Sequence, residues 1–67
     1  MLKNNLSKIM GEQRIKISEL VRISEISRST IDRIYYNETK TISLHTLDRL
    51  CWALKCTPSE LFEYVEK

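Results

Sequence analysis

A short amphipathic stretch at residues 27–36 restricts the chain to folds in which other elements hold it in place. At about 100° per residue, Ile31 and Ile34 point to one side of a helix, whereas Ser29 and Arg33 point to the opposite side. Ser27 occupies the position of an N-cap, so the first turn of this helix is expected to be exposed. The pattern therefore requires neighbouring helices that bury the isoleucines and leave the N-terminal end projecting.

The length of the chain limits how those neighbours can be arranged. A chain of 67 residues forms one domain at most, near the lower limit for folding without disulfides or a metal, so every helix must share one core. With 42% hydrophobic and 30% charged residues, one glycine and one proline, the composition is typical of a compact helical domain. We expect a single all-α domain over residues 1–67.

The net charge bears on nucleic-acid binding. The formal charge is +2 and the isoelectric point about 8.7, so the chain is only mildly basic. Any binding to a polyanion must depend on where the cations lie rather than on their number.

The first half of the chain contains three helical segments. Leu2, Leu6 and Ile9 follow helical spacing and predict a first helix over residues 2–13. After a break at residues 14–16, residues 17–24 form a second helix of barely two turns, which packing must stabilise because nucleation dominates at that length. Residues 24–26 predict a tight turn into Ser27. Two short helices joined by such a turn have the geometry of a helix-turn-helix.

The second half of the chain contains a loop and two capped helices. Residues 37–42 are polar and aperiodic, and Asn37 can adopt the left-handed conformation that ends a helix. Ser43 then caps a fourth helix. Its apolar stripe, the predicted centre of the core, consists of Leu44, Leu47, Leu50, Cys51 and Leu54. Residues 57–60 form a capping box with Pro58 at the first helical position, and the final helix is expected to run through Leu61, Phe62 and Val65.

We expect Cys51 and Cys56 to be free thiols, because neither side chain obviously faces the other. Free thiols in turn indicate a reducing compartment. Together with His45 their spacing matches no paired zinc signature, so we expect structural thiols and no metal. A chain this short has no cleft for an acid, a base and an oxyanion site, so we expect neither enzymatic activity nor a cofactor. The chain has no apolar run of signal-peptide or membrane length, which predicts a soluble, cytoplasmic protein without membrane contact.

Three segments resemble, in the right order, the Cro and phage-repressor (Xre-type) helix-turn-helix family: residues 24–30, 43–47 and 53–62. The resemblance covers roughly residues 5–64, nearly the whole chain. It implies a compact five-helix, lambda-repressor-like fold in which helices 2 and 3 form the helix-turn-helix. It also implies sequence-specific binding to double-stranded DNA, usually as a homodimer on a partly palindromic site.

The resemblance assigns roles to individual positions. The family's groove-facing positions fall on four residues near the start of the third helix, namely Arg28, Ser29, Thr30 and Arg33. Its backbone-gripping positions fall on Lys16, Asn37, Thr39, Lys40 and Thr41, and the capping residue Ser27 is a further candidate for a phosphate contact. The arginines suit base reading, because a guanidinium spans O6 and N7 of guanine, and each good contact discriminates by about 1–3 kcal/mol.

Several of these residues also fit a purely structural role. Arg28 and Asp32 are four residues apart and can pair, although Asp32 can equally accept a hydrogen bond from a cytosine amine. The Thr30 hydroxyl can bond back onto its own helix. Lys40 suits a phosphate or simply solvent, and the same alternatives apply to Lys16 and Arg22.

The chain departs from the family pattern at several positions. Ile17 stands where the family often has a glutamine that touches phosphate. Glu25 replaces the turn glycine, so it must adopt a conformation that glycine tolerates better, with its carboxylate facing outward near DNA. Met10 and Tyr35 replace an arginine–glutamate pair between the first and third helices, which predicts an apolar contact. Lys55 replaces the glycine after the fourth helix.

Trp52 lies off the apolar stripe of the fourth helix. A large exposed aromatic side chain on so small a domain suggests an interface, shared with Phe62 or Tyr64. The alternative is that Trp52 folds over the last helix and completes the core.

Two functions compete at this point. The leading interpretation is a small transcriptional regulator that binds its operator as a homodimer, with half-sites about one helical turn apart, and represses by occupying DNA. The alternative is a protein-interaction module on the same fold, such as an antitoxin, that binds a protein partner through Trp52 and the C-terminal helix.

Overall fold

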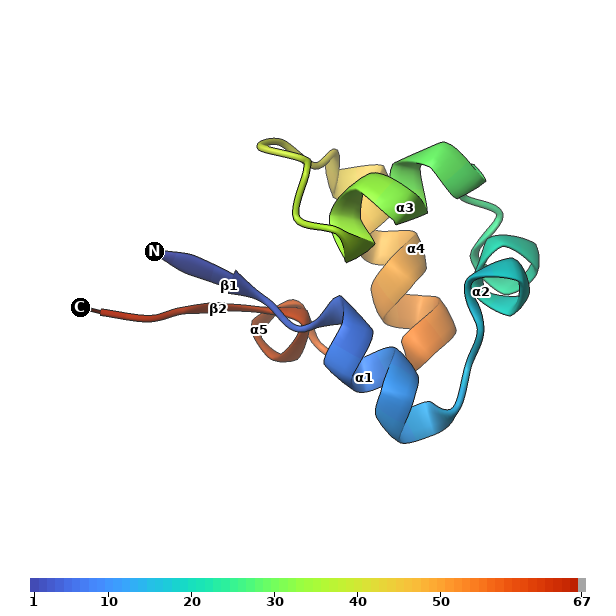
Figure 1. Ribbon diagram of the computed structural model, residues 1–67, viewed down its shortest axis with the longest axis horizontal. Helices are drawn as coiled ribbons and strands as arrows, with labels where there is room; N and C mark the ends of the chain where they lie inside the picture. Colours follow the sequence, from blue (N-terminus) through green and yellow to red (C-terminus); the bar gives the residue numbers. More distant parts are fainter. Residues whose placement is uncertain (67) are drawn as a thin grey trace.

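The computed structural model describes residues 1–66, which form five helices and one small antiparallel sheet (Figure 1). The helices are α1 (Leu6–Gln13), α2 (Ile17–Ser24), α3 (Arg28–Tyr35), α4 (Leu44–Leu54) and α5 (Pro58–Leu61). Strand β1 (Leu2–Asn4) pairs with β2 (Phe62–Tyr64), so the two ends of the chain lie side by side. The central helix is α4, with α1, α2 and α3 arranged around it (Figure 1).

All five helices contribute to one core, as the length of the chain requires. Its buried apolar side chains are Leu6, Ile9, Met10, Leu20, Ile26, Ile31, Ile34, Leu50, Leu54 and Leu61. Seven of the eight side chains with less than 2% exposure are apolar, and the eighth is Ser24. Every helix places at least one of these residues in the same cluster. Unfolding any one helix would therefore expose apolar side chains of the remaining helices to water.

The predicted helix starts at Ser27, Ser43 and Thr57 are confirmed by their hydrogen bonds. The Ser43 hydroxyl accepts from the Thr46 amide at 3.0 Å. At α5, the Thr57 hydroxyl accepts from the Glu60 amide at 3.2 Å, and the Glu60 carboxylate accepts from the Thr57 amide at 2.8 Å. These bonds satisfy amides that the helices leave unpaired, so local sequence fixes these boundaries.

The helix ends rely on non-glycine residues in the left-handed region. Arg14, Glu25, Asn37 and Lys55 have φ values of 57°, 61°, 59° and 55°. This confirms the expectations that Asn37 ends the third helix and that Glu25 adopts a glycine-like conformation. Each such residue carries a steric cost of about 1–2 kcal/mol relative to glycine's freedom, which the packed neighbours must offset.

The sheet corrects the prediction of a strictly all-α domain. The helix predicted over residues 2–13 begins at Leu6, and the last helix ends at Leu61, so Phe62 and Val65 are not helical. The leucines at positions 2 and 6 have helical spacing, but Leu2 instead pairs with Tyr64 at the other end of the chain. Local periodicity contains no information about a partner so distant in sequence.

The apolar stripe of α4 is one residue shorter than predicted. Leu44 is 83% exposed, because the first turn of α4 extends beyond the core, whereas Leu50 and Leu54 are fully buried. Met10 is buried and Tyr35 packs partly against the core, and both border one hollow between α1 and α3. This arrangement agrees with the predicted apolar contact between these two helices.

Candidate nucleic-acid interface

The helix α3 has a buried apolar side and an exposed polar side. Ile31 and Ile34 are 0% and 1% exposed. At the start of the helix, the Ser27 hydroxyl accepts a hydrogen bond from the Thr30 amide at 3.3 Å. The exposed side carries Arg28, Ser29 and Arg33. Two guanidinium groups and a hydroxyl therefore project from a helix that the core holds in place.

The turn between α2 and α3 satisfies its own backbone groups without glycine. Glu25 has φ 61° and ψ 23°, and its amide donates to the Val21 carbonyl at 3.0 Å. The buried Ser24 hydroxyl donates to the Leu20 carbonyl at 2.6 Å and accepts from the Ile26 amide at 3.2 Å. Side-chain hydrogen bonds thus close the turn and help to fix the direction in which α3 leaves α2.

The C-terminal end of α3 is tied to the sheet by Asn4. The Asn4 side-chain amide donates to the Ile34 carbonyl, one of the acceptors that a helix leaves unpaired at its end. The carbonyl oxygen of the same side chain accepts from the Leu6 amide at 2.8 Å. One asparagine therefore links β1, the start of α1 and the end of α3.

Arg28 and Arg33 differ in their partners. Arg28 Nε lies 3.9 Å from the Asp32 carboxylate, and the two side chains are 65% and 40% exposed. An exposed pair at this spacing contributes only a few tenths of a kcal/mol, so a stronger acceptor can displace it. Within residues 1–66, Arg33 forms no ion pair. Both arginines are thus available to an incoming acceptor.

Two predicted contact residues already use their hydroxyl protons inside the domain. Ser27 donates to the Thr30 hydroxyl oxygen at 2.8 Å, so Thr30 takes part in this bond only as an acceptor. Thr39 donates to the Thr41 carbonyl at 2.6 Å and so stabilises the loop after α3. Ser27 and Thr39 can donate to a phosphate oxygen only by giving up these bonds.

Two hollows flank α3 and divide the predicted DNA-contacting residues between them. One, of about 200 Å³, brings Arg33 and Thr30 next to Thr41 of the following loop. The other, of about 400 Å³, is bordered by Arg28 and Lys16 together with side chains of α1. On each flank of α3, a residue predicted to read bases thus lies near one predicted to grip the backbone.

Asn37 and Lys40 lie on the exposed side of the loop that follows α3. The Asn37 amide donates to the Ile34 carbonyl at 3.1 Å, so its left-handed conformation completes the end of the helix. Lys40 borders an apolar groove of about 420 Å³ between this loop and the sheet, lined also by Leu2 and Phe62. Its ammonium group forms no ion pair within the described residues.

The aromatic residues expected at an interface lie in two separate places. Trp52 is 60% exposed and borders a hollow with Ile23 of α2. Phe62 packs partly against the core and Tyr64 is 71% exposed, both in β2. Since the sheet and α2 lie at opposite ends of the molecule (Figure 1), Trp52 and Tyr64 do not form one continuous patch. The exposure of Trp52 also disagrees with a residue that completes the core.

Sequence reasoning missed Arg49, which contacts the turn from the core helix α4. Its Nε donates to the Ser24 carbonyl at 3.0 Å, and its Nη2 lies 3.6 Å from the Glu25 carboxylate. The guanidinium carbon is 4.6 Å from the centroid of the Trp52 ring. The spacing of Arg49 and Trp52 was the signal available in the sequence, because residues three apart are neighbours on a helix.

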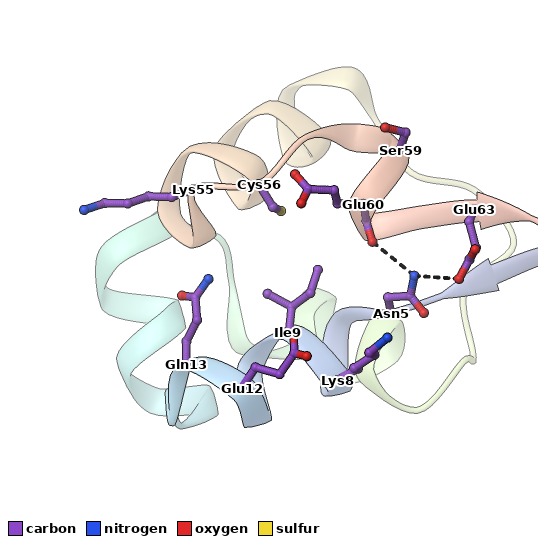
Figure 2. Close-up of a pocket in the computed structure, with 10 residues that line it drawn as sticks. All are labelled: Asn5, Lys8, Ile9, Glu12, Gln13, Lys55, Cys56, Ser59, Glu60 and Glu63. Atoms are coloured by element: carbon purple, nitrogen blue, oxygen red, sulfur yellow. Dashed lines mark hydrogen bonds between the residues drawn. The ribbon is translucent and has the colours of Figure 1, made fainter.

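A further hollow, of about 320 Å³, lies between α1, the end of α4 and α5 (Figure 2). On one side, the Asn5 amide donates to the Glu60 carbonyl and to the Glu63 carboxylate, each at 3.1 Å. The Cys56 thiol points into this hollow. Burial raises the pKa of Cys56 to about 11, and the neighbouring Cys51 adds to the shift, so the fold favours the protonated thiol.

The predicted free thiols Cys51 and Cys56 are confirmed. Among the residues that the structure describes, no cluster of three or more histidine, cysteine or acidic side chains could hold a metal ion. No helix in residues 1–66 has the length and apolar composition needed to cross a membrane.

The chain is similar to known helix-turn-helix proteins over nearly its whole length. A family model described as a Cro/C1-type helix-turn-helix DNA-binding domain matches residues 5–67, a range that contains all five helices. A Bacillus subtilis (strain 168) protein named "Uncharacterized HTH-type transcriptional regulator YozG" is 27% identical over 60 residues. The alignment covers 90% of this chain and 71% of that relative.

Proposed function

Because the chain belongs to the Cro/C1-type helix-turn-helix DNA-binding family, we propose that it is a transcriptional regulator that binds specific sequences in double-stranded DNA. The observation that carries this proposal is the exposed arginine side of α3 on a helix whose other side is fully buried. In the proposed complex, α3 enters the major groove with its N-terminal end first. The regulator name of the Bacillus subtilis relative supports the same function.

We assign base reading to the exposed side of α3. Arg33 is the principal candidate, because within residues 1–66 its guanidinium has no ion pair to break before it donates to O6 and N7 of a guanine. Arg28 would first leave Asp32, at the small cost of an exposed pair. Ser29 and Thr30 complete the proposed base-reading set, with Thr30 keeping its own hydroxyl proton available.

We assign positioning on the DNA backbone to the flanks of α3. Lys16 lies at the start of α2, and Lys40 lies with Asn37 and Thr41 in the loop after α3. Their donors suit phosphate oxygens, which fix the register of a protein on DNA without reading sequence. The other two members of the set, Ser27 and Thr39, contribute less, because their hydroxyl protons are engaged.

We further propose that two copies bind a partly palindromic operator and repress by occupying it. One α3 per major groove, with half-sites about one helical turn apart, is the arrangement that two-fold symmetric helix-turn-helix proteins use. Trp52 on one side and Phe62 with Tyr64 on the other are the candidate contacts between copies. A protein bound to the operator excludes polymerase from the same DNA, so exclusion of polymerase is the simplest mode of action.

The test of specific binding is a selection from random double-stranded DNA, followed by affinity measurements on the enriched sequence. Arg33→Ala should weaken binding to that sequence by a factor of about 5–150 and relax the preference at one base pair. Lys8→Ala is the matched control, since Lys8 is an exposed cation on α1 that borders the hollow of Figure 2. Failure to enrich any sequence, or an Arg33→Ala variant that binds as well as the control, would refute the proposal.

The dimer proposal has its own test. Light scattering on the protein with and without the selected DNA gives the number of copies, and Trp52→Lys and Tyr64→Lys introduce a charge at each candidate surface. Loss of the dimer in only one variant identifies the surface that joins the copies. A single copy on DNA at all protein concentrations would show that the homodimer is wrong.

A further inference from the structure

Arg49 contacts both halves of the turn that precedes α3. Its Nε donates to the carbonyl of Ser24, the last residue of α2, at 3.0 Å, and its Nη2 lies 3.6 Å from the Glu25 carboxylate. The Arg49 side chain is 26% exposed, so the guanidinium is partly shielded from water. A planar fork with several donors can serve a carbonyl and a carboxylate at once, which a lysine cannot do in the same way.

The Arg49 guanidinium stacks on the ring of Trp52. The guanidinium carbon of Arg49 lies 4.6 Å from the centre of the indole ring. Arginine stacks favourably on aromatic faces, and the stack restricts the rotamers of its side chain. Trp52 thus has a role inside one molecule that accounts for an exposed tryptophan beside α2 without a second copy.

Glu25 explains why the turn needs support from α4. The residue has φ 61°, a conformation that L residues adopt at a cost, and its side chain is 75% exposed on the element that leads into α3. An unpaired carboxylate there would repel phosphate, and a strained residue would leave the direction of α3 less well fixed. Arg49 opposes the repulsion because its positive charge lies beside the Glu25 carboxylate. It also restricts the turn because it joins the Ser24 carbonyl to the core helix α4.

We propose that Arg49, stacked on Trp52, is a positioning residue for DNA reading, which sets the orientation of α3 by holding Ser24 and Glu25. This inference rests on the proposed DNA-binding function and adds a residue that does not touch DNA. Glycine adopts the conformation of this turn without strain, whereas Glu25 adopts it with the support of Arg49. The two residues therefore act as a unit, and the effect of changing one depends on the other.

The test is a binding series on the selected DNA, performed well below the melting temperature of the least stable variant. Arg49→Met, which keeps the length of the side chain but removes its donors and charge, should weaken specific binding about tenfold. The slope of log affinity against log salt should stay unchanged, because Arg49 contacts no phosphate. Lys8→Met, which removes one positive charge elsewhere, should bind within about twofold of the wild type.

Two further variants separate positioning from folding. Arg49→Lys keeps the charge, and it should weaken binding about threefold because a compact ammonium cannot reproduce the separate contacts of Nε and Nη2. Glu25→Gly in the Arg49→Met background should restore the affinity to within about threefold of the wild type, because glycine adopts the turn conformation freely and carries no charge. The emission of Trp52, the single tryptophan, reports loss of the stack in Arg49→Met without DNA.

Each remaining outcome counts against the proposal. Wild-type affinity in Arg49→Met with a lowered melting temperature would show a role in stability alone. A salt slope reduced by about one would show a direct phosphate contact. Failure of Glu25→Gly to restore binding would show that Arg49 does not act through Glu25. If the wild type itself binds no specific DNA, the proposed function fails first and this inference fails with it.

Discussion

Asn5→Ala distinguishes the observed sheet-capped fold from a continuous N-terminal helix, because the two arrangements predict effects of opposite sign. Asn5 is only 8% exposed, and its side-chain amide donates to the Glu60 carbonyl and the Glu63 carboxylate, each at 3.1 Å (Figure 2). It stands at the N-cap of α1 but makes no side-chain cap bond there. All that the substitution removes is therefore the link from α1 to α5 and β2.

The loss of stability expected for Asn5→Ala can be estimated from the two hydrogen bonds that it removes. A neutral bond of this kind contributes about 0.5–1.5 kcal/mol and a bond to a charged group about 1.5–3 kcal/mol. The Glu63 side chain is 47% exposed, so water replaces much of what its carboxylate loses. The two bonds together would contribute about 2–4.5 kcal/mol, and the exposure of Glu63 reduces this, so we expect Asn5→Ala to lower the free energy of unfolding by about 1.5–2.5 kcal/mol. In a domain of this size the melting temperature would fall by about 6–20 °C.

The assay is urea and thermal unfolding followed by circular dichroism at 222 nm. Ser7→Ala is the matched control, since Ser7 is exposed on α1 and alanine there should change stability by less than about 0.5 kcal/mol. Were residues 2–13 one helix, Asn5 would be an exposed interior position and alanine would stabilise it by about 0.5 kcal/mol. A neutral or stabilising Asn5→Ala would thus refute the packing of α1 against α5 and β2.

Three further predictions concern the loop, a helix end and a thiol. Lys40→Ala should weaken specific and nonspecific DNA binding alike and reduce the salt slope of log affinity by about one, whereas an unchanged slope in a salt titration would exclude a phosphate contact. Lys55→Gly should raise the free energy of unfolding in urea by about 0.5–1 kcal/mol, because Lys55 has φ 55° and glycine relieves the strain at some entropic cost. The Cys56 pKa is raised from 9.0 to about 11, so the folded state holds the proton more tightly than the unfolded state. The contribution of the protonated thiol to the free energy of unfolding is fully present below pH 9 and is lost as the pH rises toward 11. This pH-dependent loss, measured by urea unfolding, should disappear in Cys56→Ala.

The helix boundaries that lie near a cap could be predicted because they depend on neighbours in sequence. Ser43 needs only the Thr46 amide, and Thr57 and Glu60 satisfy each other within one turn. Such contacts have the same geometry in any fold, so the residue pattern is sufficient to predict where these helices begin. The start of the first helix and the end of the last helix could not be predicted, because β1 and β2 are strands only in each other's presence.

The exposed residues of the candidate site could be predicted from the same periodicity. Ile31 and Ile34 occupy one side of α3, so Arg33 had to occupy the other. The residues that orient this helix could not be predicted in the same way. Arg49 reaches Ser24 across 25 positions, and Asn4 reaches Ile34 across 30.

The sequence by itself determined that the chain has five helices, where most of them begin, and which side of α3 carries the arginines, because these properties follow from caps and periods of a few residues. Only the tertiary structure decided that the chain ends pair as strands, that Asn4 binds the end of α3, and that Arg49 binds the turn before α3. These contacts join residues far apart in the chain, and a pattern of polar side chains does not reveal which distant carbonyl each of them will meet. The exposed arginines proposed to read DNA can therefore be identified from the sequence, whereas the orientation of their helix depends on the packed fold.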